Sequence, residues 1–257
     1  MMHADPNLSV RLAQGEADLL GAQRLRYRVF VDELGGDGDL VDHARRLERD
    51  AYDAHYDHLI VVDTRRSERD LDHVVGVYRL LPSDRATPLG FYTAGEYDLS
   101  VLQASGRQLL ELGRSCVDAT HRGGSAMYLL WSALAQYIQE REVAVLFGVA
   151  SFHGTDVEAL ADPLSLLHHR HLAPADLRVR ALQGHFQSMD LRHADDIDRK
   201  AAMRAMPALI KAYLRIGGYV GEGAFVDHPF NTTDVCLILD ILRLDPRHRA
   251  MYTGTAA

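Results

Sequence analysis

The sequence predicts an α/β protein in which helices flank a mixed sheet, and two patterns support this prediction. Residues 109–117 form an apolar, strand-like segment, followed by a glycine-rich turn, an amphipathic helix and a second apolar segment over 143–150. Because a strand, a crossover helix and a second strand form a βαβ unit, these two strands should be parallel. Two further apolar segments, over 58–63 and 74–81, are rich in β-branched residues and are joined by a polar loop, as in a hairpin.

Helices in the first half follow from the spacing of apolar residues. Mostly helical spacing predicts a helix over 16–31, and a strong apolar stripe predicts the crossover helix over 125–141. Between the first helix and the first strand, the charged and glycine-containing segment 33–57 should form a loop plus a short helix, largely in solvent.

Local signals also predict the elements of the second half. A capping box at Thr155–Glu158 predicts a helix that runs to about His169. A helix over 207–214 should begin at a proline, 217–223 should be irregular, and 235–242 should form a final strand. Because no linker-like stretch separates the halves, residues 1–257 are predicted to form one domain with short mobile termini.

Composition excludes several classes of function. The formal charge of −8 argues against a general nucleic-acid-binding protein. No uninterrupted apolar stretch is long enough for a transmembrane helix, and the N-terminus lacks the pattern of a secretory signal, so a cytoplasmic protein is expected. The two cysteines, Cys116 and Cys236, each lie in an apolar segment and are expected to be buried free thiols.

The turn from His121 to Ser125 lies between a predicted strand and a predicted helix. Backbone N–H groups at a helix N-terminus bind anions, and Gly123 and Gly124 would let a phosphate approach the backbone closely. This turn is therefore a candidate cradle for a pyrophosphate or a phosphopantetheine. The alternative is a tight turn with no ligand.

Charged residues inside apolar strands are the second candidate feature. Glu111 and Arg114 lie in the strand that leads to the turn, and Arg79 lies near the end of another strand. Ionised groups in such places are costly unless they are paired or functional. Arg79 is expected to pair with Glu111 or with an aspartate of the 50–53 segment, and a purely structural ion pair is the alternative.

No metal site is expected. The histidines of the segment 168–171 have no further ligands at a recognisable spacing, and Asp37-Gly-Asp39 is too short for a calcium loop. A nucleophilic role for Cys116 lacks a visible base.

Four segments taken together resemble the acyl-homoserine-lactone synthase-like branch of the GNAT acyltransferase fold. They are Arg26-Tyr-Arg28-Val-Phe30, Asp50-x-Tyr52-Asp53, Gly76-Val-Tyr-Arg79-Leu-Leu-Pro82 and Glu111-Leu-Gly-Arg114-Ser-Cys-Val117. The resemblance implies a twisted, mostly antiparallel sheet whose parallel strands splay near 109–117 and 143–150. It also implies a donor-binding core over 8–150 and an acceptor and acyl half over 151–245.

The second half resembles a narrower family, the ornithine-(acyl carrier protein) N-acyltransferases or lyso-ornithine-lipid synthases. The segments that resemble it are 163–174, 209–215, 221–227 and 230–235. The resemblance implies a 3-hydroxyacyl group on acyl carrier protein as donor, ornithine as acceptor, no metal, and the first step of ornithine-lipid synthesis. The lactone synthases usually have a tryptophan where this chain has Gly36, which disfavours S-adenosylmethionine as a substrate.

The expected reaction assigns roles to residues. Glu111 is the expected general base, acting with Arg79 and Arg114, and a backbone N–H of the 109–117 strand would meet the oxyanion. Alternatively, Arg79 and Arg114 organise the N-terminal segment through Asp50 and Asp53. The phosphopantetheine arm of acyl carrier protein or of coenzyme A would contact Cys116, Val117, His121, Arg122, Gly123, Gly124 and Ser125. The acceptor would contact Arg26, Phe30, Asp50, Asp53, Asn231 and Asp234, with Asp227 and Lys211 as further contributors.

Partners follow from the same expectation. Acyl carrier protein is acidic and so is this chain, so a local basic patch is required, with Arg122, Arg170, Arg178 and Arg180 as its expected sources. Because the product would be a lipid, transient contact with the inner face of a membrane is also expected. The rival hypotheses are a homoserine-lactone synthase, a protein that binds acyl thioesters without consuming them, and a peripheral membrane protein that acts mainly through surface contact. The sequence shows no clear basic amphipathic helix that would support stable anchoring.

Overall fold

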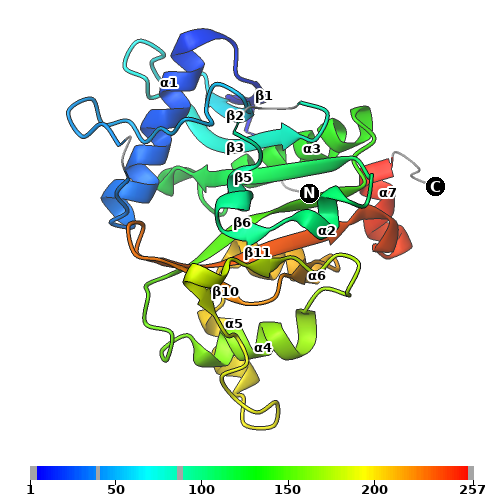
Figure 1. The fold of residues 1–257 in the computed structure, drawn as a ribbon. Helices are drawn as coiled ribbons and strands as arrows, with labels where there is room; N and C mark the ends of the chain where they lie inside the picture. The colour runs from blue at the N-terminus through cyan, green and yellow to red at the C-terminus, as the bar shows by residue number, and fades with distance from the viewer. Residues whose placement is uncertain (1–4, 39–40, 86–88, 254–257) are drawn as a thin grey trace. The chain divides into compact units, whose positions relative to one another are not determined.

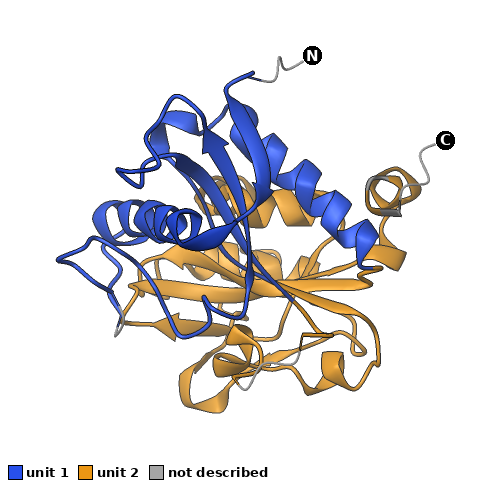
Figure 2. Cartoon of the chain, turned by 90° about the horizontal axis from the view of Figure 1, so that it is seen from above, with its two compact units in different colours: residues 1–81, 112–141 blue, residues 82–111, 142–257 orange. Residues whose placement is uncertain are grey.

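The computed structural model describes residues 5–38, 41–85 and 89–253. These residues group into two compact units (Figure 2). The first unit comprises residues 1–81 and 112–141, and the second comprises 82–111 and 142–257. Strand β5 (Leu109–Val117) is divided between them. The predicted division into halves at residue 150 stays a prediction.

In the first unit, strands follow the hydrogen-bonded order β1, β2, β3 and the later part of β5 (Figure 1). Their bounds are Leu8–Leu12 for β1, Asp57–Asp63 for β2 and Val74–Pro82 for β3. The pairs β1–β2 and β2–β3 are antiparallel, which confirms the predicted hairpin. Strand β1 was not predicted, because its five residues are too few for a clear alternating pattern.

Helices α1 (Gly15–Arg26) and α3 (Ser125–Glu140) cover opposite faces of this sheet (Figures 1 and 2). Close approach depends on glycine on both faces. A Cβ atom at Gly21 of α1 would lie 2.8 Å from the side chain of Val74, and one at Gly76 of β3 would lie 3.2 Å from Leu130 of α3. Both helices confirm the predicted ones, and α1 continues as a π-helix over Tyr27–Glu33.

The predicted short helix within 33–57 is wrong. Over the described residues 34–38 and 41–56 the chain forms turns and one β-bridge, between Asp42 and Leu47. Leu47 and Glu48 are 1% exposed, so this segment is not simply solvated. Asp42 and Asp50 accept the backbone N–H groups of Arg45 and Tyr52, and such local hydrogen bonds compete with helix formation.

The second unit contains the parallel pair that the sequence predicts. The first part of β5 pairs with β6 (Val145–His153), joining Leu109–Glu111 to Val145–Phe147. Strand β11 (Thr232–Asp240) is antiparallel to β6, and the order continues through β10 (Ala224–Asp227) to β8 (Phe186–Gln187). Strand β9 (Tyr219–Val220) pairs with β11, while β4 (Tyr97–Asp98) and β7 (Arg180–Ala181) form a separate two-stranded sheet.

The helices of the second unit are shorter. Their bounds are Ser100–Gln103 for α2, Ala161–His171 for α4, Arg199–Ala205 for α5, Ala208–Arg215 for α6 and Pro246–Thr253 for α7. Across the described residues, no helix combines the length and apolar character needed to cross a bilayer.

The predicted start of helix α4 is wrong by several residues. The helix begins at Ala161, and in the preceding turn the carboxylate of Asp156 accepts the N–H groups of Glu158 and Ala159. A helix that began at Thr155 would place Pro163 in its interior, where proline lacks the N–H and clashes with the preceding turn. Starting at Ala161 puts this proline in the first turn, where no N–H is needed.

Candidate active site

Glu111 is the last residue of the parallel ladder between β5 and β6, and its side chain is buried. Both carboxylate oxygens accept backbone hydrogen bonds, Oε2 from the N–H of Tyr92 at 2.9 Å and Oε1 from that of Thr93 at 2.6 Å. Tyr92 and Thr93 are the first two residues of a 3-10 helix over Tyr92–Gly95. The residue before it, Phe91, makes an edge-to-face contact with Phe147 of β6. The backbone N–H groups of Tyr92 and Thr93 therefore orient this carboxylate.

Thr93 is a residue that the sequence analysis missed. It is fully buried, and its hydroxyl has no hydrogen-bond partner among the described residues. Its backbone N–H is the donor to Glu111. A buried polar group without a protein partner marks a place where water or a ligand is expected. No pattern in the sequence around residue 93 distinguishes this hydroxyl from a solvated one.

Six charged side chains of the first unit form a closed ring of alternating sign, called the ionic ring below. In ring order they are Arg26, Glu48, Arg114, Asp50, Arg79 and Asp53. The Arg79 guanidinium lies 2.6 Å from an Asp50 oxygen and 2.9 Å from Asp53, and Arg26 lies 2.5 Å from Asp53. The predicted pairing of Arg79 with the 50–53 segment is therefore confirmed. Glu48 was missed because it lies among charged residues that look solvated.

Burial divides the ring into an inner and an outer part. Arg26, Glu48, Arg79 and Asp53 are at most 5% exposed, whereas the side chains of Asp50 and Arg114 are 17% and 14% exposed. Asp50 and Arg114 are therefore the members that a small molecule can reach, and the inner four hold them in place.

Electrostatics keep the ring ionised. Burial opposes the charged form of each carboxyl, but two neighbouring guanidinium groups lower the pKa of Glu48, of Asp50 and of Asp53 below its ordinary value. Burial also opposes the charge of Arg26, yet Glu48 and Asp53 raise its pKa. Breaking one contact would leave the opposite charge buried without its partner.

Two local features position Arg114 and Arg79. Arg114 has a left-handed backbone with φ of 50°, so the alternation of β5 is interrupted there. In a regular strand, residue 114 would lie on the face opposite to Glu111. The Arg79 guanidinium lies over the ring of Tyr56, 4.6 Å from its centroid, and Tyr56 is buried.

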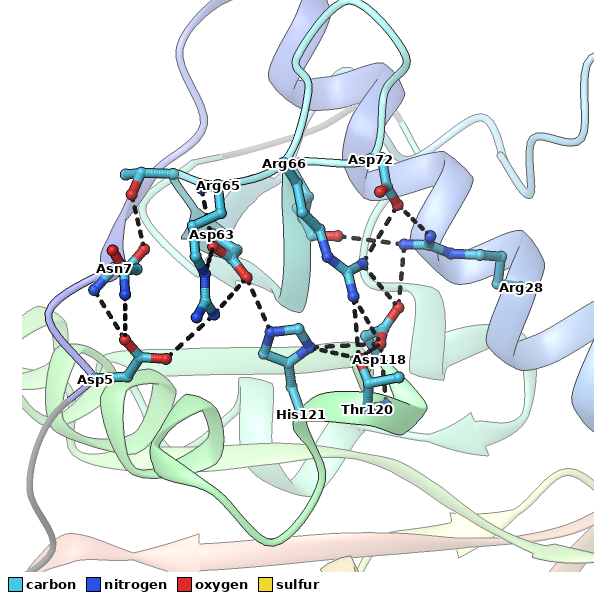
Figure 3. Close-up of polar contacts among 12 residues, drawn as sticks. Asp5, Asn7, Arg28, Asp63, Arg65, Arg66, Asp72, Asp118, Thr120 and His121 are labelled. Carbon is cyan, nitrogen blue, oxygen red and sulfur yellow. Dashed lines mark hydrogen bonds and ion pairs between the residues drawn. The ribbon is translucent and has the colours of Figure 1, made fainter.

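The turn that leads to α3 is held by a second polar network, shown in Figure 3. The carboxylate of Asp118 accepts the backbone N–H of Thr120 at 3.0 Å and its hydroxyl at 2.5 Å. His121 lies between two carboxylates, with Nε2 3.2 Å from Asp63 and Nδ1 3.4 Å from Asp118. Arg66 donates to both Asp118 and Thr120. His121 therefore serves to brace the turn.

The same network extends across the first unit through partly exposed arginine side chains. Arg28 pairs with Asp72 at 2.6 Å and with Asp118 at 3.4 Å, and Arg65 pairs with Asp63. Burial opposes the charge of Asp118, but hydrogen bonds from Thr120 and Arg66 lower its pKa well below the ordinary value.

The N-terminus of α3 keeps its backbone donors. Gly124 is its N-cap residue and supplies no side-chain cap. Gly123 has a φ of 76°, a conformation that glycine adopts without strain, and no atom lies within 4 Å of the position a Cβ would occupy. Arg122, in contrast, donates to the carbonyl of Val117 and pairs with Glu33 at 2.6 Å. An anion at this turn would thus meet backbone N–H groups from Ser125 onward.

Two other predicted donor contacts have buried side chains. Cys116 belongs to the apolar core between α1 and the sheet, where burial raises the pKa of its thiol to about 12, and Phe30 packs against the same core. The side chain of Val117 is also buried. These residues would contact a ligand mainly through their backbone, and their predicted roles stay predictions.

The acceptor residues predicted in the second half lie around the β10–β11 hairpin. Asn231 has a φ of 50° in its turn, and the carboxylate of Asp227 accepts the N–H of Phe230 at 3.0 Å. Asp234 is 4% exposed, and the hydroxyl of Tyr97 donates to its backbone carbonyl at 3.0 Å. These contacts explain the hairpin structurally, and contact with an acceptor stays a prediction for them.

Of the four arginines predicted for a carrier-protein patch, two are bound to carboxylates. Arg122 pairs with Glu33 and Arg180 with Glu222. Arg178 donates to the carbonyl of Ala173, and Arg170 has no carboxylate partner among the described residues.

The tandem histidines have one more polar neighbour than the sequence indicates. Ligand atoms of His168, His169 and Asp190 lie within 4.8 Å of one another. His169 Nε2 lies 3.0 Å from the carbonyl of Arg192 and 3.3 Å from Asp190, so hydrogen bonds account for its position. The prediction of no metal at these histidines stays a prediction.

Comparison with known proteins places the chain. Residues 25–132 match the acetyltransferase (GNAT) domain family. A protein of Rhodobacter capsulatus named L-ornithine N(alpha)-acyltransferase is 59% identical over 254 residues, covering 98% of this chain and 97% of that protein. FeeM, an N-acyl amino acid synthase from uncultured soil microbes, shares the fold, with a TM-score of 0.52 and 10% identity over 93% of each chain. The AHL synthase LasI has a TM-score of 0.50 and 16% identity, over 97% of this chain and 96% of that chain.

These findings confirm the predicted fold and the prediction of an acyltransferase. The two structural likenesses concern the fold, whereas the sequence identity extends over nearly the full length of both proteins. The chain therefore belongs to the family of L-ornithine N(alpha)-acyltransferases.

Proposed function

We propose that the chain transfers a 3-hydroxyacyl group from the phosphopantetheine thioester of acyl carrier protein to the α-amino group of ornithine. Membership of the family supports the reaction and the acceptor. The structural observation that carries the proposal is the buried carboxylate of Glu111, oriented by two backbone N–H groups at the end of the parallel ladder.

The reaction needs a base because the α-amino group of an amino acid is mostly protonated near neutral pH. In the proposed step, Glu111 accepts a proton from the ammonium group, directly or through a water. The freed nitrogen attacks the thioester carbonyl, the C–N bond of the amide forms, and the C–S bond breaks. As the amide forms, the nitrogen gives up a second proton, which the departing thiolate takes up, and Glu111 returns the first proton to solvent.

The hydroxyl of Thr93 is a further candidate in this step. It is buried without a protein partner among the described residues, and its own N–H holds Glu111. A water bound to this hydroxyl would be well placed for the proton transfer, because the same threonine also donates its backbone N–H to Glu111.

For the donor, we assign the phosphate of the pantetheine arm to the backbone N–H groups at the start of α3. The absence of a side-chain cap at Gly124 and the open space beside Gly123 support this assignment. His121 would act by bracing the turn through Asp63 and Asp118.

For the acceptor, we assign Asp50 and Arg114, the two partly exposed members of the ionic ring. Ornithine carries ammonium groups and a carboxylate, so it needs one anionic and one cationic partner. Arg26, Arg79 and Asp53 would be positioning residues, because they are buried and would act on the acceptor only by holding Asp50 and Arg114 in place.

The test is product formation by the purified protein, read by mass spectrometry. The donors are 3-hydroxyacyl-acyl carrier protein and the corresponding coenzyme A thioester, and the acceptors are ornithine, other amino acids and S-adenosylmethionine. We expect an ornithine amide, acylated at the α-nitrogen, from the carrier-protein donor. A lactone product from S-adenosylmethionine, or donor binding without any product, would contradict the proposal.

The role of Glu111 is tested in the same assay. Glu111→Gln should lower turnover by about 10²–10⁴ if this residue is the general base. Glu68→Gln, a change at an exposed glutamate, is the matched control and should leave the rate unchanged. Near-normal turnover of a folded Glu111→Gln protein would remove the assignment while leaving the overall reaction intact.

A further inference from the structure

Helices α5 and α6 present an unusual concentration of positive charge. From Arg199 to Gly221 the chain has no aspartate or glutamate, its longest stretch without either. The same stretch contains five cationic residues, Arg199, Lys200, Arg204, Lys211 and Arg215, and these include both lysines of the chain.

None of these five side chains has a carboxylate partner among the residues that the structure describes. Several arginines elsewhere in the second unit are paired, as Arg107 is with Asp240 and Arg243 with Asp176. The formal charge of the chain is −8, so acidic residues are abundant. A shortage of carboxylates therefore does not explain why these cations are unpaired. Unpaired cations keep their charge available for an external anionic partner.

The geometry gathers these charges on one surface. In α5, Ala202 and Met206 are buried, and α5 packs against α4. Lys200, Met203 and Arg204 share the opposite, exposed face of the helix because their spacing is i, i+3 and i+4.

Helix α6 continues this surface. The ammonium group of Lys211 donates to the carbonyl of Met203 at 3.2 Å, which places it at the C-terminal end of α5. Arg215 lies one turn further along the same side of α6. Ile210 and Tyr213 form the buried side of α6, which contacts β11.

Met203 gives this surface an apolar centre. It is 38% exposed, it lies on the same face of α5 as Lys200 and Arg204, and its carbonyl accepts the hydrogen bond from Lys211. Cations around an exposed apolar side chain match the headgroup region of an anionic bilayer, where charge attracts and the apolar group enters the interface. Lysine is a compact, hydrated point charge, which suits a diffuse array of phosphates better than a specific bidentate contact.

We propose that the face formed by Lys200, Met203, Arg204, Lys211 and Arg215, called the cationic face below, binds the surface of an anionic phospholipid bilayer. The use of this contact rests on the proposed function, because an acylated ornithine is an amphiphile that must pass from the enzyme into a membrane. The contact itself is a property of the surface and can be measured without catalysis.

The test is sedimentation of the full-length protein with vesicles, without donor or acceptor. Vesicles of equal parts phosphatidylcholine and phosphatidylglycerol should bind the protein, vesicles of phosphatidylcholine alone should bind it far less, and added salt should release it. The variant Lys200→Gln, Arg204→Gln, Arg215→Gln should lower the partition coefficient on the order of a hundredfold, about fivefold for each charge.

A matched control removes the same number of exposed, unpaired cations elsewhere. Arg45→Gln, Arg69→Gln, Arg247→Gln should change the partition coefficient little. A gain is expected from Asp195→Asn, Asp196→Asn, because these exposed aspartates precede α5 and oppose anionic lipid. Equal losses in the two triple variants would overturn the proposal, since net charge alone would then explain binding.

A carrier protein is the competing occupant, and kinetics separate the two. If the cationic face binds lipid, the Lys200, Arg204, Arg215 variant turns over soluble donor normally in the absence of vesicles. A raised KM for the carrier-protein donor with unchanged vesicle binding would assign the face to that protein and overturn the lipid proposal. Failure of the product assay together with normal vesicle binding would refute only the proposed reaction.

Discussion

The ionic ring and the cationic face both contain positively charged side chains, but the ring pairs them with carboxylates and the face does not. In the ring, three arginines alternate with three carboxylates, and four of the six side chains are at most 5% exposed. On the cationic face, four positive side chains lie along two helices without a carboxylate partner among the described residues. The ring holds Asp50 and Arg114 in place, whereas the charges of the cationic face are not neutralised by a carboxylate.

The difference shows how burial decides what a charge can do. A guanidinium that is removed from water must be paired, because the desolvation of an uncompensated ion is costly. Pairing then restricts the side chain to a structural or positioning role. An exposed cation has no such requirement, so its lack of a partner costs little and leaves it free to act at long range.

Breaking the ring should have the largest effect. Arg26→Met keeps an unbranched side chain of similar length but leaves Glu48 and Asp53 without one of their two guanidinium partners. We expect a loss of about 3–5 kcal/mol in the free energy of unfolding, measured by urea titration, because buried carboxylates would lose their compensation. Arg204→Gln, on the cationic face, should change the same quantity by less than about 0.5 kcal/mol. Similar values for the two variants would contradict the contrast drawn here.

The pH dependence of stability should sharpen the contrast. The guanidinium groups lower the pKa of Asp50 and Asp53 below the ordinary value of 3.8, so folding favours their ionised forms. Their contribution is therefore complete at pH values above 3.8 and is lost as the pH falls below it. The difference in unfolding free energy between wild type and Arg26→Met should shrink over this range, whereas the small effect of Arg204→Gln should stay constant. A difference that grows on acidification would show that the ring does not depend on ionised carboxyls.

Much of this fold was predictable because its main elements follow from local sequence patterns and from the rules that govern how strands and helices connect. The parallel pairing of β5 with β6 follows from a strand, a turn and an amphipathic helix read in order. The partner segment of Arg79 was also predictable, because a charge inside an apolar strand requires an opposite charge. For the same reason Glu111 was recognised as a candidate without any knowledge of its donors.

The rest depended on tertiary contacts that no local pattern encodes. Glu48 lies in the sequence Arg-Arg-Leu-Glu-Arg-Asp, where every charged residue looks solvated, yet it is 1% exposed and closes the ring. Thr93 is an ordinary loop threonine until its burial is known. The start of α4 was misplaced because the capping box at Thr155–Glu158 forms a turn around Asp156, while Pro163 sets the helix start.

The network around the turn before α3 is intermediate between the ring and the cationic face, and breaking it should change stability much less than breaking the ring does. Its ion pairs are made but exposed, since the side chains of Arg28 and Asp72 are 26% and 41% exposed. Asp72→Asn removes one carboxylate that Arg28 and Arg66 share, and both arginines keep Asp118 as a partner. We therefore expect a loss of about 0–1 kcal/mol in urea titration, further reduced by salt. A loss as large as that of Arg26→Met would mean that exposure does not weaken these ion pairs. Burial would then not explain the difference between the ionic ring and the exposed charges.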